Sequence, residues 1–320
     1  MTARIIGTGS ALPNRVITND DLAKIVDTSD EWISSRTGIR SRHISDAEET
    51  AAVLAARAGQ KAIENSGIQK DEVEMILVAT CSAEDYFPNL GCQVQNMLGM
   101  EHTVGMDLNA ACSGFLFSLN TAFAYIKAGI YKTILVIGTE TLSKIVNWKD
   151  RSTCVLFGDG AGACVIRAEE TGVLDFVQHS DGSMGHVLTA KASSTETPVQ
   201  PETGADPIYM DGQAVFKFAV KKVPECIEEI LERNHLDKEE VSCFILHQAN
   251  KRIIQSVAKR LKLSEEKFPV NLEGHGNTSA ASIPLLLDDL NREGRLHKGD
   301  KLILSGFGAG LTWGATLLEW

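Results

Sequence analysis

Hydrophobic and polar positions alternate along the chain in blocks of two lengths. Short apolar runs, such as 134–138 (ILVIG) and 302–306 (LILSG), have the length and composition of strands buried on both faces. Between such runs lie amphipathic segments of helix length, for example 51–67 and 215–234. Strand-length runs that alternate with helices predict an α/β protein in which sheets and helices form layers.

The same pattern occurs twice in the chain, at a spacing of roughly 165 residues. Residues 70–80 (KDEVEMILVAT) resemble 238–248 (KEEVSCFILHQ), because each has a charged turn followed by an apolar run. Residues 106–138 resemble 270–306 in the same way, and each segment predicts a strand, a polar turn, a long helix and a buried strand. The repetition indicates an old duplication.

A duplication predicts two similar βαβ-rich halves that pack against each other. We expect the first half to cover 1–170 and the second to cover 171–320. Function is then expected at the junction, where equivalent loops from the two halves converge on one site.

Composition and charge narrow the class of protein. The chain has 320 residues, 43% of them hydrophobic, which allows a large core in one big domain or two coupled halves. The N-terminal residues lack the pattern of a signal peptide, and no apolar run reaches the roughly 18 residues of a membrane span. We therefore expect a cytoplasmic protein that does not bind membranes. A net charge of -11 also argues against general nucleic-acid binding.

The seven cysteines show no paired spacing, no CxxC motif and no zinc-site pattern with histidine. Most of them lie inside apolar runs and are interpreted as small buried hydrophobic residues. We expect no metal and no cofactor.

Cys112 differs from the others because it stands where an apolar strand ends and a helix begins, in NAACSGF. Unpaired N–H groups and the helix dipole at that position favour the thiolate, which is the nucleophilic form. Small neighbours leave room for a substrate. From the local sequence alone, a core cysteine in a tight turn is the favoured alternative.

Two further polar side chains follow equivalent elements of the second half. His247 comes directly after a buried strand, and Asn277 lies in a loop of glycines and small residues. Each alone is commonly structural. Together with Cys112 they suit acyl-thioester chemistry, in which a sulfur nucleophile works beside two hydrogen-bond donors for an oxyanion.

Seven motifs in order complete this picture: GTGSALP, DEWISSRTGIRSRHI, NAACSGF, GDGAGA, LHQAN, GNTSAASIP and GFGAGLTWG. Over its whole length the chain resembles the thiolase-fold condensing enzymes, and among them the β-ketoacyl-acyl carrier protein synthase III family. The resemblance implies a layered α-β-α-β-α sandwich. It also implies a decarboxylative condensation of an acyl-CoA primer with malonyl-acyl carrier protein, which initiates fatty-acid synthesis.

The resemblance assigns roles to matching positions. Cys112 would carry the acyl group, while His247 and Asn277 would stabilise the enolate formed when the malonyl group loses CO₂. Backbone N–H groups of Cys112 and Ala309 would form the oxyanion hole, although the family usually has glycine at the latter position. Phe307 would pack beside the malonyl carboxylate.

Other matching positions concern substrates and the partner subunit. Trp32 and Arg151 resemble the pair that holds the adenine of CoA, and Arg36 resembles a contact to a CoA phosphate. Phe87 matches a residue that reaches the acyl pocket of a second subunit, which implies a homodimer.

Acyl carrier protein is acidic, so an enzyme with a net charge of -11 needs a local basic patch to bind it. The resemblance favours docking on Arg252 and Lys217, with Lys221 and Arg40 as further candidates. Lys221 lies one helical turn from Lys217. Lys259 is interpreted as an ordinary solvated residue.

Two alternatives stay open. One is another thiolase-fold enzyme, above all a ketosynthase of secondary metabolism. A degradative thiolase needs a second cysteine in the C-terminal loop, which is absent, and Glu84 stands near the expected place of a hydroxymethylglutaryl-type glutamate without the matching motif. The other alternative is a non-catalytic acyl-binding scaffold.

Overall fold

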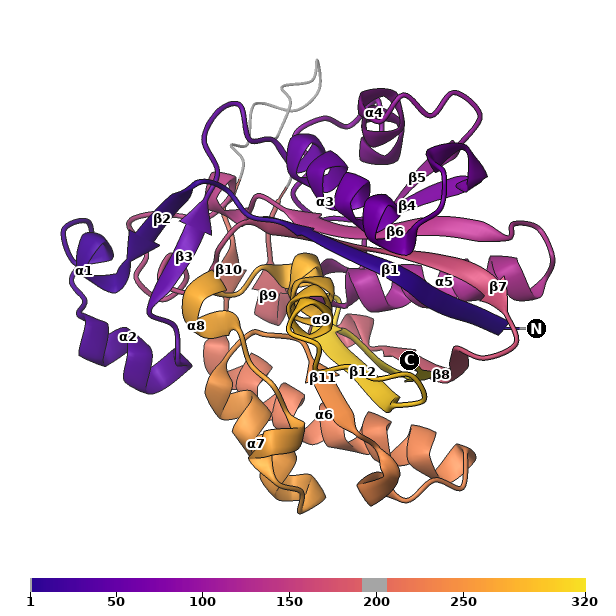
Figure 1. The fold of residues 1–320 in the computed structure, drawn as a ribbon. Coiled ribbons are helices and arrows are strands. Elements are labelled where there is room, and N and C mark those ends of the chain that lie inside the picture. The colour runs from indigo at the N-terminus through magenta and orange to yellow at the C-terminus, as the bar shows by residue number, and fades with distance from the viewer. Residues whose placement is uncertain (1, 192–205) are drawn as a thin grey trace.

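The computed structural model describes residues 2–191 and 206–320 and contains two large sheets (Figure 1). The first sheet has the strand order β1 (Thr2–Ala11), β7 (Gly160–Glu169), β6 (Thr133–Glu140), β4 (Met75–Ala79) and β5 (Val104–Leu108). The second has the order β11 (Cys243–Leu246), β12 (Lys301–Gly308), β13 (Thr312–Glu319) and β8 (Val173–Ser180). The predicted strands 134–138 and 302–306 therefore lie within β6 and β12, and both are buried.

The sheets and helices form five layers (Figure 1). The outer helices α3 (Ala51–Ser66) and α4 (Leu90–Met97) cover one face of the first sheet, and α6 (Gly212–Arg233) and α7 (Lys251–Leu261) cover the second sheet. The middle layer consists of α5 (Gly114–Lys127) and α9 (Ser282–Arg292). Helix α5 packs against strands of both sheets, which explains why it is apolar on most faces. The predicted α-β-α-β-α sandwich is confirmed.

The two sheets repeat one pattern of strand directions. In each sheet, a parallel pair of strands (β4 with β6, β11 with β12) is followed along the strand order by two antiparallel pairs. Residue 170 lies between β7 and β8, which belong to different sheets. The division into the halves 1–170 and 171–320 stays a prediction, because both halves contribute to the shared middle layer.

One predicted strand is wrong. Residues 270–272 (VNL), the expected counterpart of β5, form no strand, because the short helix α8 (Leu272–His275) already begins at Leu272. The backbone of Asn277 instead pairs with Phe157 of the first half as an isolated bridge. The second sheet therefore has four strands where the first has five, and the Asn277 loop is attached across the junction.

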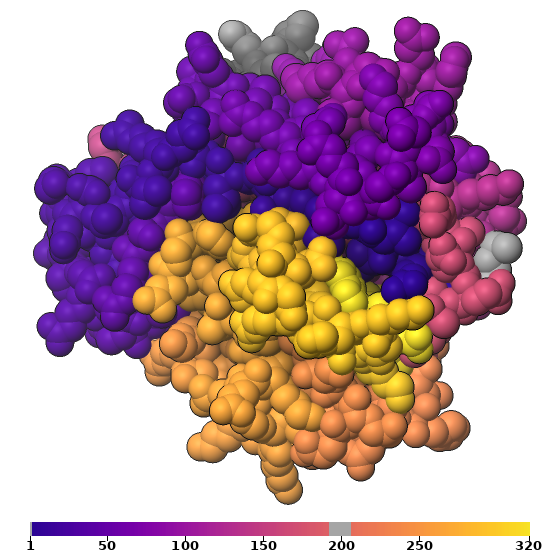
Figure 2. All heavy atoms as spheres, in the orientation of Figure 1, coloured from indigo at the N-terminus to yellow at the C-terminus, as the bar shows by residue number. Residues whose placement is uncertain are grey.

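Smaller elements surround the junction between the halves. They are α1 (Asn19–Leu22), α2 (Asp30–Thr37), the pair β2 (Arg15–Thr18) and β3 (Ser41–Ile44), and the pair β9 (Leu188–Thr189) and β10 (Tyr209–Met210). Short 3₁₀ turns cover Lys70–Glu72, Ala111–Ser113, Leu142–Lys144, Gly182–Val187, Lys238–Glu240, Glu265–Lys267 and Ser279–Ala281. On the face seen in Figure 2, yellow C-terminal residues lie directly against the indigo N-terminal strand, in agreement with the packing of α9 on β1.

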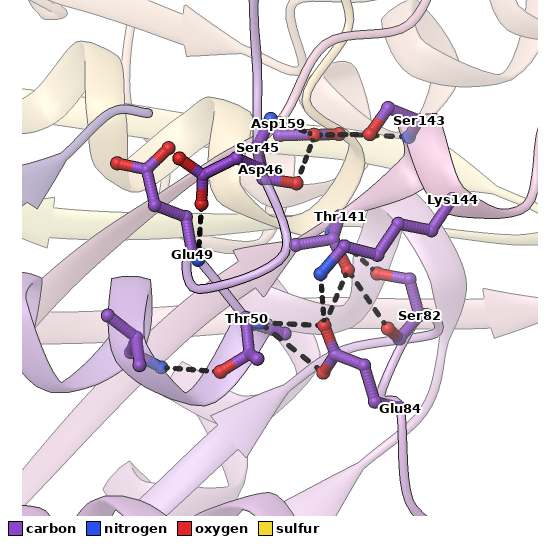
Figure 3. A network of polar contacts seen from close by, with 12 residues as sticks. Ser45, Asp46, Glu49, Thr50, Ser82, Glu84, Thr141, Ser143, Lys144 and Asp159 are labelled. Atoms are coloured by element: carbon purple, nitrogen blue, oxygen red, sulfur yellow. Dashed lines mark hydrogen bonds and ion pairs between the residues drawn. The ribbon is translucent and has the colours of Figure 1, made fainter. Parts of the chain in front are cut away.

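The GDGAGA motif joins segments of the first half around a buried carboxylate. Asp159 accepts hydrogen bonds from the N–H and hydroxyl groups of both Ser45 and Ser143 (Figure 3). A buried charge is tolerated when several donors surround it. The motif therefore has a structural role, because it fixes the turn that leads into β7.

Candidate active site

Cys112 lies in a tight 3₁₀ turn between β5 and α5. The preceding residue, Ala111, has a φ of 46°, a left-handed conformation that non-glycine residues adopt at a cost. The start of β13 holds the turn, because Ser113 Oγ donates to the Thr312 carbonyl at 3.1 Å and Thr312 Oγ1 donates to the Ala110 carbonyl at 3.3 Å. The strained turn presents the sulfur to the junction of the two halves.

The surroundings of Cys112 disfavour the thiolate form of its thiol. Burial raises its pKa to about 12, a hydrogen bond with Ser279 opposes that shift, and the nearby Glu140 adds to it. This direction opposes the effect expected of the helix N-terminus, which favours the thiolate. Desolvation of the sulfur is the largest of the effects that raise this pKa.

His247 follows β11 and is 2% exposed. Burial lowers the pKa of its imidazole to about 3, so the ring is neutral at physiological pH. Its Nδ1 lies 2.6 Å from Ser282 Oγ, and that hydroxyl also accepts the Gln248 N–H at 3.3 Å. A Ser282 hydroxyl that donates to Nδ1 leaves the proton on Nε2, and the ring then has one donor for the pocket.

Asn277 is held by its backbone and by its side-chain oxygen. Its N–H donates to the Leu156 carbonyl at 2.9 Å, and its carbonyl accepts the Gly158 N–H at 3.0 Å. Its Oδ1 accepts the Ser279 N–H at 2.9 Å. Because the amide oxygen is occupied, the Nδ2 group is the part of the side chain left to donate to a ligand.

The three side chains line one cavity of about 360 Å³. Phe307 and Gly308 belong to the same wall, and the Phe307 ring meets the His247 ring edge to face at a centroid distance of 5.4 Å. Residues from both halves therefore meet in one chamber, as the duplication predicted.

A second, mostly apolar cavity of about 300 Å³ also borders Cys112. Ala309 and Cys81 line it together with Leu142, Ile145 and Ile208. Its apolar walls suit a short acyl chain attached to the sulfur.

The predicted CoA-binding residues lie together at the surface. Trp32 stands on α2, with the Arg36 guanidinium 4.7 Å and the Arg151 guanidinium 5.4 Å from its ring centroid. Arg36 also lines the 360 Å³ cavity. Arg151 is anchored by Asp27, whose backbone carbonyl accepts from it at 2.9 Å.

The predicted docking residues differ in their surroundings. Arg252 is exposed and lines the cavity that holds Cys112. Lys217 and Lys221 are exposed on α6, and neither has an ion pair within the described part of the chain. Arg40 is paired with Glu273 at 3.0 Å and with Asp30 at 3.4 Å, so its charge is already partly compensated.

Phe87 is 87% exposed and does not reach either cavity of its own chain. Met97 and Val104, apolar residues that follow it in the chain, are also about half exposed. Exposed apolar side chains of this size are typical of a surface that another molecule covers.

Glu84 is engaged in structural contacts (Figure 3). Its carboxylate accepts the first N–H of α3 at 3.0 Å, binds Lys144 Nζ at 2.9 Å and accepts the Thr141 hydroxyl at 3.3 Å. It lines neither cavity at Cys112. These contacts disfavour a hydroxymethylglutaryl-type catalytic glutamate at this position.

Sequence reasoning missed four residues around the site: Cys81, Glu140, Ser279 and Ser282. Both serines lie in the GNTSAASIP motif, so their presence could have been noted. Glu140 ends an otherwise apolar strand, a placement that is unusual for a carboxylate. Cys81 was interpreted only as a buried cysteine.

Within residues 2–191 and 206–320, no cluster of His, Cys, Asp or Glu side chains could hold a metal ion. No helix in these two ranges has the length and apolarity that crossing a bilayer requires.

Comparisons with known proteins agree with this geometry. A profile of 3-oxoacyl-[acyl-carrier-protein] synthase III matches residues 106–182, and one of its C-terminal part matches 231–320. The β-ketoacyl-[acyl-carrier-protein] synthase III of Clostridium acetobutylicum is 49% identical, with 100% of this chain and 99% of that protein covered.

Solved structures have the same fold. The 3-oxoacyl-[acyl-carrier-protein] synthase III of Aquifex aeolicus is 43% identical with a TM-score of 0.92, covering 99% of this chain and 100% of that one. The priming β-ketosynthase of the R1128 polyketide pathway is 35% identical with a TM-score of 0.93, covering 99% and 96%. The lower identity to the polyketide enzyme does not favour the secondary-metabolism alternative.

The five-layered fold and the shared chamber at its junction define a condensing enzyme of the thiolase fold. Such an enzyme transfers an acyl group and forms a carbon–carbon bond. Within that class, the chain belongs to the 3-oxoacyl-[acyl-carrier-protein] synthase III family, whose members initiate fatty-acid synthesis.

Proposed function

We propose that Cys112 attacks the thioester of an acyl-CoA primer and carries the acyl group. The N–H groups of Cys112 and Ala309 hold the oxyanion that forms on the carbonyl, and the CoA thiolate leaves. Because a backbone donor is the same in alanine and glycine, the methyl group of Ala309 changes the shape of the pocket and not the number of donors. The apolar cavity beyond Cys112 receives the acyl chain.

His247 and Asn277 then act on malonyl-acyl carrier protein. The Nε2–H of the neutral imidazole and the Nδ2–H of the amide donate to the thioester oxygen, where negative charge develops as CO₂ departs. The carbon of the resulting enolate attacks the acyl carbonyl, and the Cys112 sulfur leaves. Phe307 gives the malonyl carboxylate an apolar neighbour that favours its loss as neutral CO₂.

The substrates enter from the surface that carries Trp32. The indole ring, with Arg36 and Arg151 over it, offers stacking and cation–π contact to the adenine of CoA, and the guanidinium groups offer charge to its phosphates. No metal or cofactor takes part in this scheme.

Acyl carrier protein docks on exposed positive charge near the cavity. Arg252 is the strongest candidate because it is exposed and lines the chamber, and Lys217, Lys221 and Arg40 extend the patch. The net charge of -11 makes such a local patch necessary for an acidic partner.

Phe87 and its apolar neighbours form the contact of a homodimer in the cytoplasm. The exposed fraction of Phe87, 87%, supports this assignment because a monomer would leave a large apolar surface in water. A shorter side chain at position 87 is expected to weaken the dimer and change the length of acyl group accepted.

The meeting of Cys112, His247 and Asn277 on one cavity is the observation that carries this proposal. Incubation with acetyl-CoA, followed by intact-mass spectrometry, tests it directly. Cys112→Ala should lose both the acyl adduct and condensation, whereas Cys81→Ala, which alters the other thiol on the acyl cavity, should still form the adduct. An adduct that persists in Cys112→Ala would remove Cys112 from the nucleophile role and favour an acyl-binding scaffold.

A further inference from the structure

Arg42, on β3, is a fully buried guanidinium close to the loop that carries Asn277. Its exposed fraction is 0%, and among the residues that the structure describes no carboxylate forms an ion pair with it. Its Nη2 donates to the Val155 carbonyl at 2.6 Å, and its Nη1 donates to Asn19 Oδ1 at 2.9 Å and to the Ile17 carbonyl at 3.4 Å. The charge is therefore compensated only by neutral acceptors, which come from two segments far apart in the chain.

The energetic cost of this arrangement points to a role besides stability. A buried charge without an opposite charge loses hydration that neutral acceptors replace only in part. The Nε of Arg42 also has no hydrogen-bond partner within the described part of the chain. Burial lowers the pKa of Arg42 to about 10, which still leaves the side chain charged near pH 7. Because apolar side chains often replace buried charged groups without loss of stability, the fold alone does not explain an arginine here.

The segment that accepts from Arg42 is the one that pairs with Asn277. The Asn277 N–H donates to the Leu156 carbonyl at 2.9 Å, and the Gly158 N–H donates to the Asn277 carbonyl at 3.0 Å, which together form the isolated bridge. Val155 directly precedes Leu156 in the chain. The guanidinium is therefore attached one residue away from the bridge.

The aliphatic stem of Arg42 lies against two glycines of the same bridge. A Cβ on Gly158 would lie 3.0 Å from Arg42 Cβ, and a Cβ on Gly276 would lie 3.2 Å from it. Gly276 directly precedes Asn277 and has a φ of 68°, a left-handed conformation that suits glycine. Arg42 therefore meets both segments that form the bridge, 155–158 and 276–277.

Asn19 anchors the guanidinium on the side of the first half. Its Nδ2 donates to the Ile39 carbonyl at 2.7 Å and to Asp30 Oδ1 at 2.8 Å. Because both amide hydrogens are used, the Oδ1 atom is the part of the side chain that accepts from Arg42. Asn19 is 1% exposed, so this anchor is buried as well. The arginine thus links a fixed amide to the segment that holds Asn277.

We propose that Arg42 is a positioning residue for Asn277, because it holds the segment 155–158 in the place where the Asn277 amide can donate to the enolate oxygen. The inference rests on the proposed function, in which Asn277 is one of two donors to the enolate formed from malonyl-acyl carrier protein. Arg42 lines neither cavity at Cys112. Its effect therefore passes through the backbone of the bridge, since close-packed interiors transmit displacements.

The effect of losing Arg42 has an upper limit. Removal of one oxyanion donor costs about 10²–10³-fold in rate, and a residue that acts only through that donor cannot cost more. Misplacement of a group by about 1 Å costs about 10²-fold. Arg42→Met keeps an unbranched stem beside the two glycines and removes every donor. We expect this variant to release CO₂ from malonyl-acyl carrier protein about 10-fold to 10²-fold more slowly than the parent protein.

The test is a double-variant cycle in the full-length protein, with Arg42→Met, Asn277→Ala and the two combined. Release of CO₂ from malonyl-acyl carrier protein and acylation of Cys112 by acetyl-CoA are measured separately. In the Asn277→Ala background, Arg42→Met should change CO₂ release by less than about twofold, because the side chain that Arg42 positions is then absent. Acylation should stay within about threefold of the parent rate, because Asn277 takes no part in that step.

Two further variants guard against a folding effect. Arg42→Lys keeps a donor for the Val155 carbonyl and should recover part of the lost CO₂ release, and it takes the place of Arg42→Met in the cycle if the methionine variant does not fold. Leu54→Ala leaves a cavity in a core cluster that contains no residue of 155–158. It should lower stability and keep both parent rates.

The outcomes separate this inference from the proposed function. Three results would overturn the role of Arg42: CO₂ release at the parent rate in Arg42→Met, equal losses of CO₂ release and acylation in that variant, or equal losses of CO₂ release in the parent and Asn277→Ala backgrounds. Undiminished CO₂ release in Asn277→Ala alone would instead refute the proposed function of Asn277, and the inference with it.

Discussion

Gly308 lies against the backbone of the nucleophile turn, and its replacement by alanine is a sharp test of the site geometry. A Cβ at this position would lie 2.7 Å from Cys112 N and 3.0 Å from Ser113 N, whereas ordinary contacts begin near 3.4 Å. Both atoms belong to the backbone, so no side-chain rotation relieves the clash. The turn or β12 has to move by about 0.7 Å, the difference between the two distances.

A displacement of this size lowers both the stability of the protein and the rate of acyl-enzyme formation. Overpacking of a buried site costs about 1–3 kcal/mol in the free energy of unfolding. Misplacement of a reacting atom by about 1 Å costs about 10²-fold in rate. We therefore expect Gly308→Ala to fold, with reduced stability, and to form the acyl-enzyme about 10²-fold more slowly.

Gly306 provides a matched control on the same strand. A Cβ there would lie 3.4 Å from the nearest atom, Ile283 Cδ1, and 3.6 Å from His247 Cβ, which are ordinary contacts. Quenched-flow acylation by acetyl-CoA and urea unfolding should be measured for both variants. Equal acylation rates and equal unfolding free energies for Gly308→Ala and Gly306→Ala would refute the proposed packing of β12 on the Cys112 turn.

Three further predictions concern docking, CoA and pH. Arg252→Glu should raise the KM for malonyl-acyl carrier protein about tenfold or more at low salt, while Lys259→Glu on the same helix should leave it unchanged. Equal KM values for the two variants would remove Arg252 from the docking patch. Trp32→Ala should raise the KM for acyl-CoA by about fivefold to thirtyfold, corresponding to about 1–2 kcal/mol of lost cation–π contact, and an unchanged KM would place CoA elsewhere. Because His247 has a folded pKa of about 3 and an ordinary value of 6.5, only the unfolded chain binds its proton between these values, so stability falls as pH falls below 6.5. Between pH 7 and 5, the free energy of unfolding of His247→Gln, measured in urea, should therefore fall by about 2 kcal/mol less than that of the parent protein. Equal decreases in the two proteins would contradict a buried, neutral His247 ring.

Much of the fold follows from periodicity, but the predicted strand at 270 does not form. The apolar runs of β6 and β12 and the apolar helix α5 are strong signals, because a segment buried on several faces has to be apolar throughout. The run VNL is too short to determine its own conformation, and farther along the chain Asn277 pairs with Phe157. Such a pairing joins residues far apart in sequence, which local patterns do not reveal.

The chemistry of the site was predictable only in part. The local strand-to-helix position singled out Cys112 and suggested a thiolate, whereas burial raises the pKa of its thiol. Desolvation depends on every element packed around the sulfur, so it is visible only in the folded chain. Glu140 was missed for the same reason, because its five donor contacts come from two segments far from it in sequence, residues 80–82 and Ser279.

The division of labour between the sulfur and the two donors is tested most directly in His247→Ala and Asn277→Ala. Acyl-enzyme formation from acetyl-CoA and release of CO₂ from malonyl-acyl carrier protein should be measured separately for each variant. We predict that both variants still acylate Cys112, whereas decarboxylation falls by about 10²–10³-fold, the effect of removing one oxyanion donor. Loss of acylation in step with decarboxylation, or decarboxylation at the parent rate, would contradict the account.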